Sequence, residues 1–181
     1  ALVAACSSNG ERSMHASLVG AEDLPGQWEY SEPTASPYRT VDLCGQPRVR
    51  PEPISSASTG WAVTPDDGPI FGERIERFDD SDTVDTLVQY PLDVPCTFTR
   101  EDGARWRTER VDAFELGDNA RVYLVRSLDR PDSFNYEVVI ASDDVALLAV
   151  LNTREPNREL LDELVQVAWS KAVDEGVVTA R

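Results

Sequence analysis

The sequence has almost no histidine, lysine or methionine, and it contains no motif of a known catalytic class. Its one histidine, His15, precedes the globular part that we expect from residue 22, which leaves that part without a Ser-His-Asp or Cys-His site. A phosphate-binding glycine loop, a GxSxG elbow and an HExxH helix are also missing. The absence of a CxxC pair or a Cys/His cluster argues against structural zinc. We therefore expect no catalytic residue, no metal and no cofactor.

Positive charge and long apolar runs are scarce as well. The 33 acidic residues outnumber the 17 basic ones, for a net charge of −16. That balance argues against a nucleic-acid partner, because phosphates require a basic surface, and against electrostatic adhesion to anionic lipids. The longest apolar run, residues 145–151, is far shorter than a membrane span and predicts a buried strand.

The first residues have the pattern of the end of a bacterial lipoprotein signal peptide. Leu2-Val3 and the small Ala4-Ala5 precede Cys6, and in such a signal the cysteine becomes the new N-terminus and carries diacylglycerol on its sulfur. We expect residues 1–5 to be the signal remnant and residues 6–21, which are small and polar through Ser17, to be a flexible tether. The protein would then be extracytoplasmic and held at the cell membrane by its lipid. The alternative is an apolar N-terminus with a chance cysteine.

Three cysteines are an odd number, and lipidation of Cys6 would leave Cys44 and Cys96 as a pair. Both lie beside turn residues, where strand ends can meet. A disulfide between them would stabilise the fold by about 4 kcal/mol in the chain-entropy model. The alternative is two buried free thiols.

Hydrophobic periodicity predicts one α+β domain over residues 22–181. We expect strands at 28–30, 70–78, 97–100, 105–115, 122–125, 136–140 and 145–151, with an irregular loop over 46–60. Strands from residue 96 onward would form an antiparallel meander, with Asp102-Gly103 as a hairpin turn. Helices are expected from Asp80 or Ser81 to about residue 90 and from 158 to 174. Both helices are expected to pack on one face of the sheet.

Three groups of polar residues are candidate sites. Arg105 and Arg107 share one face of a predicted strand, as an anion site or as a solvated face neutralised by Glu101, Asp102 and Glu109. Asp79-Asp80-Ser81-Asp82 begins like a calcium loop, but the EF-hand glycine is missing and helix capping explains it better. A carboxylate pair for glycoside hydrolysis is not visible from spacing in a sequence.

The order of these features resembles actinobacterial sensor-domain lipoproteins, which are similar to the extracellular domain of mycobacterial receptor serine/threonine kinases. The resemblance rests on the lipobox, the turn before Trp28, Asp42-Leu43-Cys44-Gly45, the strand–helix unit up to Cys96, and an apolar strand leading into a long C-terminal helix. Sixteen of the 17 basic residues are arginine, as is common in the GC-rich genomes of actinobacteria. The kinase relatives carry two disulfides, whereas this domain can form one.

The resemblance implies a secreted α+β module that binds an unknown ligand in a cleft and has no established catalytic residues. We expect a lipid-anchored, extracytoplasmic ligand-binding or sensor domain, with its cleft between the sheet and an irregular loop at 46–69. Its partner would be a small molecule or an envelope protein. The alternatives are an accessory lipoprotein that modulates a membrane protein and, less favoured, an envelope hydrolase that uses a carboxylate pair.

Overall fold

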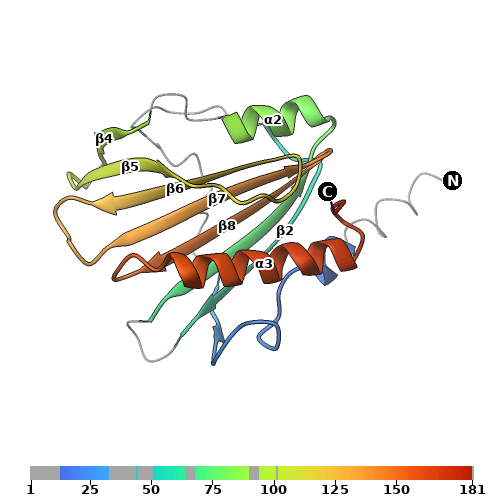
Figure 1. Cartoon of the computed structure of the whole chain (residues 1–181), viewed down its shortest axis with the longest axis horizontal. Coiled ribbons are helices and arrows are strands. Elements are labelled where there is room, and N and C mark those ends of the chain that lie inside the picture. Colours follow the sequence, from blue (N-terminus) through green and yellow to red (C-terminus); the bar gives the residue numbers. More distant parts are fainter. Residues whose placement is uncertain are drawn as a thin grey trace, which may run out of the picture.

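The computed structural model describes residues 13–32, 44, 51–63, 68–89, 94–100 and 102–180. Eight antiparallel strands form one sheet in the order β1-β2-β3-β8-β7-β6-β5-β4 (Figure 1). The strands are β1 Glu29–Tyr30, β2 Ser55–Ala62, β3 Ile70–Arg77, β4 Cys96–Thr99, β5 Arg105–Val111, β6 Asn119–Ser127, β7 Phe134–Ser142 and β8 Val145–Thr153. The predicted α+β class and the antiparallel meander, which is β4 to β8, are confirmed.

Helices α2 (Ser81–Gln89) and α3 (Arg158–Asp174) begin at the caps that the sequence predicts. The Thr83 backbone N–H donates to Asp80 Oδ1 at 2.7 Å, and the Leu160 N–H donates to Asn157 Oδ1 at 3.0 Å. These hydrogen bonds satisfy amide groups that have no partner within the first helical turn. In the part of the chain that the structure describes, neither helix is long and apolar enough to cross a membrane.

The two helices lie on opposite faces of the sheet, so the prediction that both cover one face is wrong. On β8, Leu147 and Ala149 belong to the core that includes α3, whereas Ala146 packs with Val84 and Leu87 of α2. Successive residues of a strand point to opposite faces, which separates these two groups. Figure 1 shows α2 on one side of the ends of β7 and β8 and α3 on the other. We call these the α2 face and the α3 face.

The α3 face carries the main hydrophobic core. The helix buries one side of its surface against the sheet, and each buried leucine or valine side chain contributes about 1.5–3 kcal/mol. The buried residues are Leu161, Leu164, Val165, Ala168, Trp169 and Ala172. The loop between β5 and β6 closes over this core at Gly117, which has a φ of +64°. A Cβ at Gly117 would come within 2.3 Å of the Ala141 carbonyl oxygen, so only glycine fits there.

The N-terminal segment from residue 13 belongs to the folded domain. Met14, Leu18 and Val19 are buried in the core on the α3 face, although we expected a flexible tether as far as residue 21. His15 is exposed, and residues 13–16 are helical. Apolar side chains at 14, 18 and 19 follow a helical spacing, a signal that the polar composition of the segment obscured. Residues 6–12 lie outside the described residues.

The segment 55–62, which we predicted to be part of an irregular loop, is strand β2. It pairs with β3 in a continuous register from Ser55 opposite Arg77 to Ala62 opposite Ile70. Serine and glycine have a low strand propensity, but pairing with a neighbour outweighs local preference.

The strands that flank the loop at Gly117 also differ from prediction: β5 ends at Val111, and β6 begins at Asn119.

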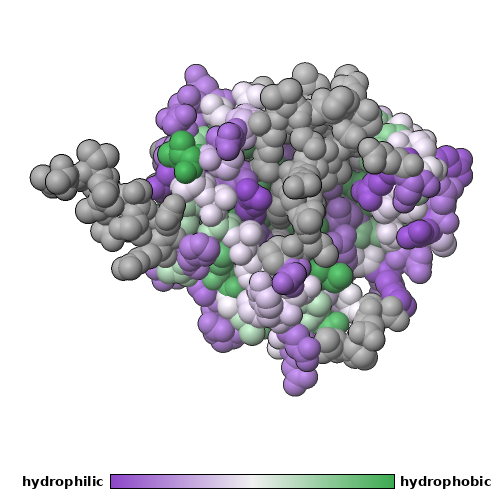
Figure 2. Space-filling view, turned by 180° about the vertical axis from the view of Figure 1, so that it is seen from behind, coloured by the Kyte–Doolittle hydropathy of each residue, from purple (hydrophilic) through white to green (hydrophobic). Residues whose placement is uncertain are grey.

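The surface of the side opposite α3 is mainly hydrophilic in its described part. Figure 2 shows this side, with green residues scattered among purple and white ones. The large apolar side chains exposed on the whole molecule, within the described ranges, are Tyr30, Ile54 and Leu128. Ile54 precedes the first residue of β2, whereas Tyr30 pairs with Trp61 near the last residue of β2. Ile54 and Tyr30 therefore belong to different parts of the surface. Isolated apolar residues of this kind are ordinary on protein surfaces.

A buried carboxyl group, Glu73 of β3, holds the N-terminal segment on the sheet. Its Oε2 accepts the Val19 backbone N–H at 2.9 Å, and the Val19 carbonyl accepts the Trp61 indole N–H at 3.2 Å. A few residues later, Asp23 forms an ion pair with Lys171 of α3. Burial raises the pKa of Glu73 to about 7, although the Val19 N–H and the Lys171 charge lower it. Glu73 thus supplies the buried hydrogen bond that holds Val19 of the N-terminal segment on the sheet.

We predict that Glu73→Gln makes the stability of the domain less dependent on pH. Because the pKa of Glu73 is raised from 4.5 to about 7, its contribution to stability is complete below pH 4.5 and decreases as pH rises to 7. A glutamine keeps an acceptor for Val19 and has no charge to bury. Urea unfolding at several pH values should show that the variant loses on the order of 3 kcal/mol less than the wild type across this interval. Parallel stability curves would contradict the prediction.

Candidate functional site

The two faces of the sheet differ in the polarity of what they bury. On the α2 face, α2 covers Val139, Ala141 and Ala146 near one end of the strands. Further along β5 and β7, the same face buries a set of side chains with polar atoms. They are Trp106, Thr108, Asn135 and Glu137, and we call them the polar strip. The strip follows from the alternation of β7, where Asn135 and Glu137 share the face of Val139.

Glu137 is the ionisable group of the polar strip. Its Oε1 accepts a hydrogen bond from Asn135 Nδ2 at 3.1 Å. Burial raises the pKa of Glu137 to about 8, although the positive charge of Arg100 lowers it. The carboxyl group is therefore mostly protonated at neutral pH, and it can donate a hydrogen bond as well as accept one.

Other atoms of the strip have hydrogen-bonding capacity that the described protein groups do not use. Asn135 Oδ1, Thr108 Oγ1 and Trp106 Nε1 are buried without a hydrogen-bond partner. Thr108 faces Val125 across β5 and β6, and Val125 faces Asn135 across β6 and β7, so they lie in one row. Arg100 stacks on the Trp106 ring with its Cζ 3.9 Å from the ring centre. Donors and acceptors without net charge suit a neutral, hydrogen-bonding molecule.

The buried carboxyl groups of the α2 face do not form a hydrolase pair. Glu76 and Glu137 both lie on this face, and Glu76 is paired with Arg74 at 2.6 Å. Glu76 is opposite Ala146 and Glu137 is opposite Val150, four residues further along β8. Strand geometry puts these positions about 13 Å apart along the strand and two strand spacings apart, or about 16 Å in all. Carboxyl pairs of glycosidases are separated by roughly 5–9.5 Å.

The structure places Arg105 and Arg107 on one strand face and Trp106 on the other, as the sequence predicted. Trp106 is buried with Phe98. Arg105 is held by Asp129, whose Oδ1 accepts from Nη2 at 2.7 Å and from Nε at 3.1 Å. The hydrogen bonds lower the pKa of Asp129. Arg107 donates from Nε to Glu109 at 2.5 Å. Arg105 and Arg107 are thus paired with different carboxylates, Asp129 and Glu109.

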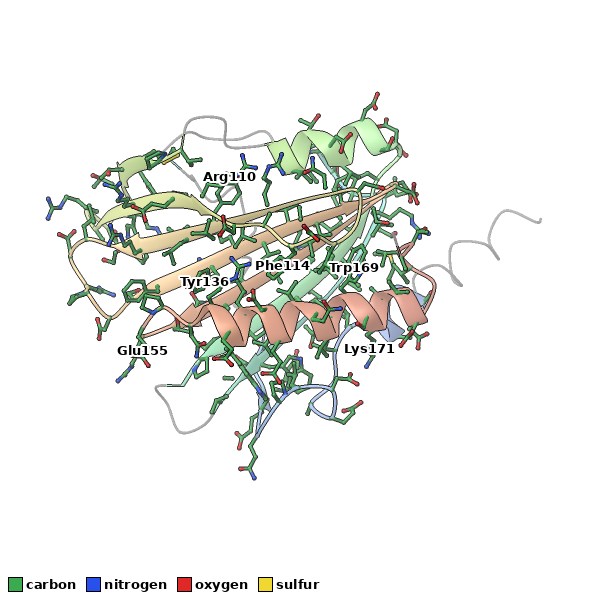
Figure 3. The ribbon with its side chains drawn as sticks, in the orientation of Figure 1. Arg110, Phe114, Tyr136, Glu155, Trp169 and Lys171 are labelled. Carbon is green, nitrogen blue, oxygen red and sulfur yellow. A yellow bond between two sulfur atoms is a disulfide. The ribbon has the colours of Figure 1, made fainter. Side chains whose placement is uncertain are left out.

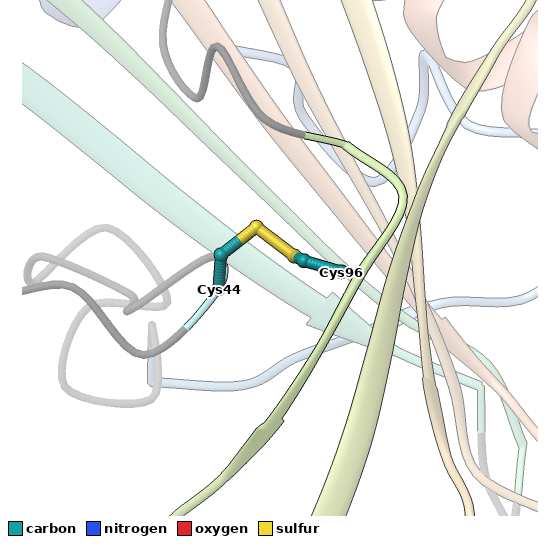
Figure 4. Close-up of a disulfide and its surroundings, with 2 residues drawn as sticks. All are labelled: Cys44 and Cys96. Atoms are coloured by element: carbon teal, nitrogen blue, oxygen red, sulfur yellow. A yellow bond between two sulfur atoms is a disulfide. The ribbon is translucent and has the colours of Figure 1, made fainter.

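Cys44 and Cys96 form a disulfide in the structure, as predicted, with a Cα–Cα distance of 5.4 Å. Figure 4 shows the bond reaching from Cys44 to Cys96 at the start of β4. It closes a sequence separation of 52 residues. Cys6, the predicted lipidation site, lies outside the described residues.

The acidic stretch at 79–82 caps α2. Asp80 accepts hydrogen bonds from the backbone and the side chain of Thr83, which lower its pKa. Within the described ranges, no three His, Cys, Asp or Glu side chains are grouped closely enough to hold a metal ion. The serines at 55–58 lie on β2, where sequence alone placed them in a loop.

Sequence reasoning missed the polar strip and one arginine of the α3 face, Arg126. Asn135 precedes the predicted strand at 136–140, and Glu137 is a polar residue within that strand. The available signal was the two-residue alternation of Asn135, Glu137 and Val139. Arg126 follows Leu124 at the same spacing, but β6 extends two residues beyond its predicted end.

We predict that Glu137→Gln removes a pH-dependent loss of stability between pH 4.5 and 8. The raised pKa of Glu137 means that its stabilising contribution is complete below pH 4.5 and is lost as pH approaches 8. Thermal melting at pH 6 and pH 9 should show a smaller decrease for the variant than for the wild type. Glu163→Gln on the exposed side of α3 is the matched control and should behave as the wild type does. Equal decreases in all three proteins would contradict the prediction.

Comparison with known proteins shows the fold and little beyond it. No family model matches the chain, and no curated protein matches its sequence. Among solved structures, the chain is similar to the extracellular domain of PknH from Mycobacterium tuberculosis, at 11% identity and a TM-score of 0.58. The similarity covers 91% of this chain and 95% of the other. The chain therefore shares the fold of that extracellular domain.

Proposed function

We propose that this protein is a lipid-anchored, extracytoplasmic sensor domain that binds a small molecule and has no catalytic activity. The shared fold with an extracellular domain, over nearly the full length of both chains, supports a location outside the cytoplasm. The Cys44–Cys96 disulfide supports the same location, because such bonds persist in oxidising compartments.

The polar strip is the observation that carries the binding function. Burying Trp106 Nε1, Thr108 Oγ1 and Asn135 Oδ1 without partners costs free energy, because a buried polar group without a hydrogen bond destabilises a fold by about 1–3 kcal/mol. A surface selected only for stability would carry apolar residues there. A neutral ligand with donors and acceptors would satisfy the three groups. The ligand site of this proposal is therefore on the α2 face.

The proposed lipid anchor would hold the domain close to the membrane. Ser13 directly precedes Met14, the first residue of the core. Seven residue steps separate Cys6 from Ser13. An extended chain covers at most about 3.6 Å per residue, which limits this distance to about 25 Å. Such a domain would sample molecules at the membrane surface.

We predict that Cys6 carries the lipid. Cells that express the full-length precursor, with its complete signal peptide, and are fed an alkyne-tagged fatty acid should yield a labelled protein in the membrane fraction. Cys6→Ala should abolish the labelling and release the protein, whereas the neighbouring Ser7→Ala should keep both. Equal labelling of Cys6→Ala would refute lipidation at this residue and leave the ligand-binding proposal standing.

We predict that the chain from Ser7 onward, secreted by an actinobacterial host, carries a small molecule in native mass spectrometry. Thr108→Val together with Asn135→Leu removes polar atoms of the strip at similar volume and should abolish the adduct. Arg105→Gln, on the exposed part of β5, should retain it. A mass without adduct in every preparation would contradict ligand binding and favour an accessory role through the outer surface.

A further inference from the structure

Two arginines face each other on the α3 face, on the side of the sheet opposite to the polar strip. Arg107 of β5 is directly opposite Arg126 of β6. They share the face of Glu109 and Leu124, the neighbouring pair in the same register. Figure 1 shows that α3 runs across β8, β3 and β2 and leaves this part of β5 and β6 uncovered. Accordingly, 40% of the Arg107 side chain and 42% of the Arg126 side chain are exposed.

One carboxylate serves both arginines. Glu109 Oε1 is 2.5 Å from Arg107 Nε and 3.5 Å from Arg126 Nη2. The trio therefore has a net charge of +1, in a chain whose net charge is −16. Other arginine ion pairs of the described residues have one carboxylate for each guanidinium, such as Arg105 with Asp129 and Arg158 with Asp162. Like charges directly across a strand pair destabilise a sheet, so stability does not account for this arrangement.

The two guanidinium groups retain donors for a ligand. A guanidinium has five N–H groups, and the hydrogen bonds found for Arg107 and Arg126 use one each, both to the same oxygen. The Arg126 Nε is buried without a partner among the described residues. Planar guanidinium groups bind carboxylate and phosphate oxygens in pairs. The free donors thus match a group with several anionic oxygens.

Apolar side chains continue from the arginines across the sheet. Phe134 of β7 is opposite Arg126, and Tyr136 of β7 is opposite Leu124. Beyond them lies a pocket of about 380 Å³. It is lined by Val111, Asp112, Tyr136, Arg158 and Asp162. Figure 3 shows Tyr136, which lines this pocket, and Phe114 beside the first half of α3.

We propose that Arg107 and Arg126 bind the carboxylate or phosphate group of a small molecule whose apolar part lies on Leu124, Phe134 and Tyr136. This site is separate from the polar strip and uses charge where the strip uses neutral hydrogen bonds. Glu109 holds the two guanidinium groups in place before the ligand binds, and it also competes with the ligand for them. The site is thus expected to select for an anionic group joined to an apolar body.

The test is a calorimetric titration of the chain from Ser7 onward with phenyl phosphate and benzoate, with benzyl alcohol as the neutral probe. Both anions should bind at low salt, and benzyl alcohol should bind far more weakly. Arg107→Gln with Arg126→Gln should weaken anion binding by at least about tenfold, as expected for charge-assisted hydrogen bonds. Arg105→Gln, on the same strand face, should change it by less than about twofold, because Asp129 already neutralises that residue.

Glu109→Gln distinguishes a ligand site from a merely structural ion pair. Removing the competing carboxylate should strengthen anion binding by about three- to tenfold. Loss of binding in Glu109→Gln with an unchanged melting temperature would overturn the proposal, as would equal effects of Arg105→Gln and the double variant. Failure of every anion to bind would overturn it too, and would leave the adduct on the polar strip unaffected.

A second arm identifies the source of the anionic group. Vesicles of phosphatidylcholine with phosphatidic acid present the same phosphate on a lipid. If they retain the wild type and not the Arg107→Gln, Arg126→Gln variant, the ligand is a lipid headgroup. If they retain neither protein while phenyl phosphate still binds, the site takes a free small molecule. Equal retention of both proteins by the vesicles, with no binding of phenyl phosphate, would overturn the site.

Discussion

Strands β7 and β8 lie in the middle of the sheet, and their alternate side chains enter two different environments. One set packs under α3 and the N-terminal segment, where Ile140 and Leu147 belong to a continuous apolar core. The other set meets α2 at one end only, through Ala141 and Ala146. Because a shift of register by one residue would exchange the two sets, the apolar core specifies the register of the whole sheet. The contrast between the faces depends on this register.

That register explains why the polar groups lie where they do. With the α3 face supplying most of the hydrophobic stabilisation, the α2 face can carry Asn135 and Glu137 at a tolerable cost. Arg107 and Arg126, which share the α3 face, lie beyond the area that α3 covers. The fold thus offers two chemically different surfaces on one sheet: neutral and buried on one side, cationic and half-exposed on the other.

Two carboxyl groups with raised pKa values have different roles in this arrangement. Glu73 joins the N-terminal segment to the sheet through the Val19 amide, so its protonation is coupled to the packing of that segment. Glu137 contacts Asn135 within the strip, so its protonation sets the hydrogen-bonding character of the proposed ligand site. In both groups burial is the dominant cause of the raised pKa, as expected for a carboxyl group removed from water.

Local patterns determined a large part of this protein. Asn157 as a cap with the apolar spacing of α3, Asp80 with the short α2, and the apolar runs of β7 and β8 each identified an element from neighbouring residues. The pairing of Cys44 with Cys96 followed from counting cysteines. The tertiary structure decided what depends on distant residues. Ser55–Ala62 is a strand because β3 pairs with it, and Met14 is buried because α3 and the sheet form a core there. Glu137 is a protonated, buried group because the fold excludes water around it, and Arg126 faces Arg107 because β5 and β6 pair in one register. Helix caps and apolar spacing act over a few residues, whereas burial and strand register are properties of the assembled sheet.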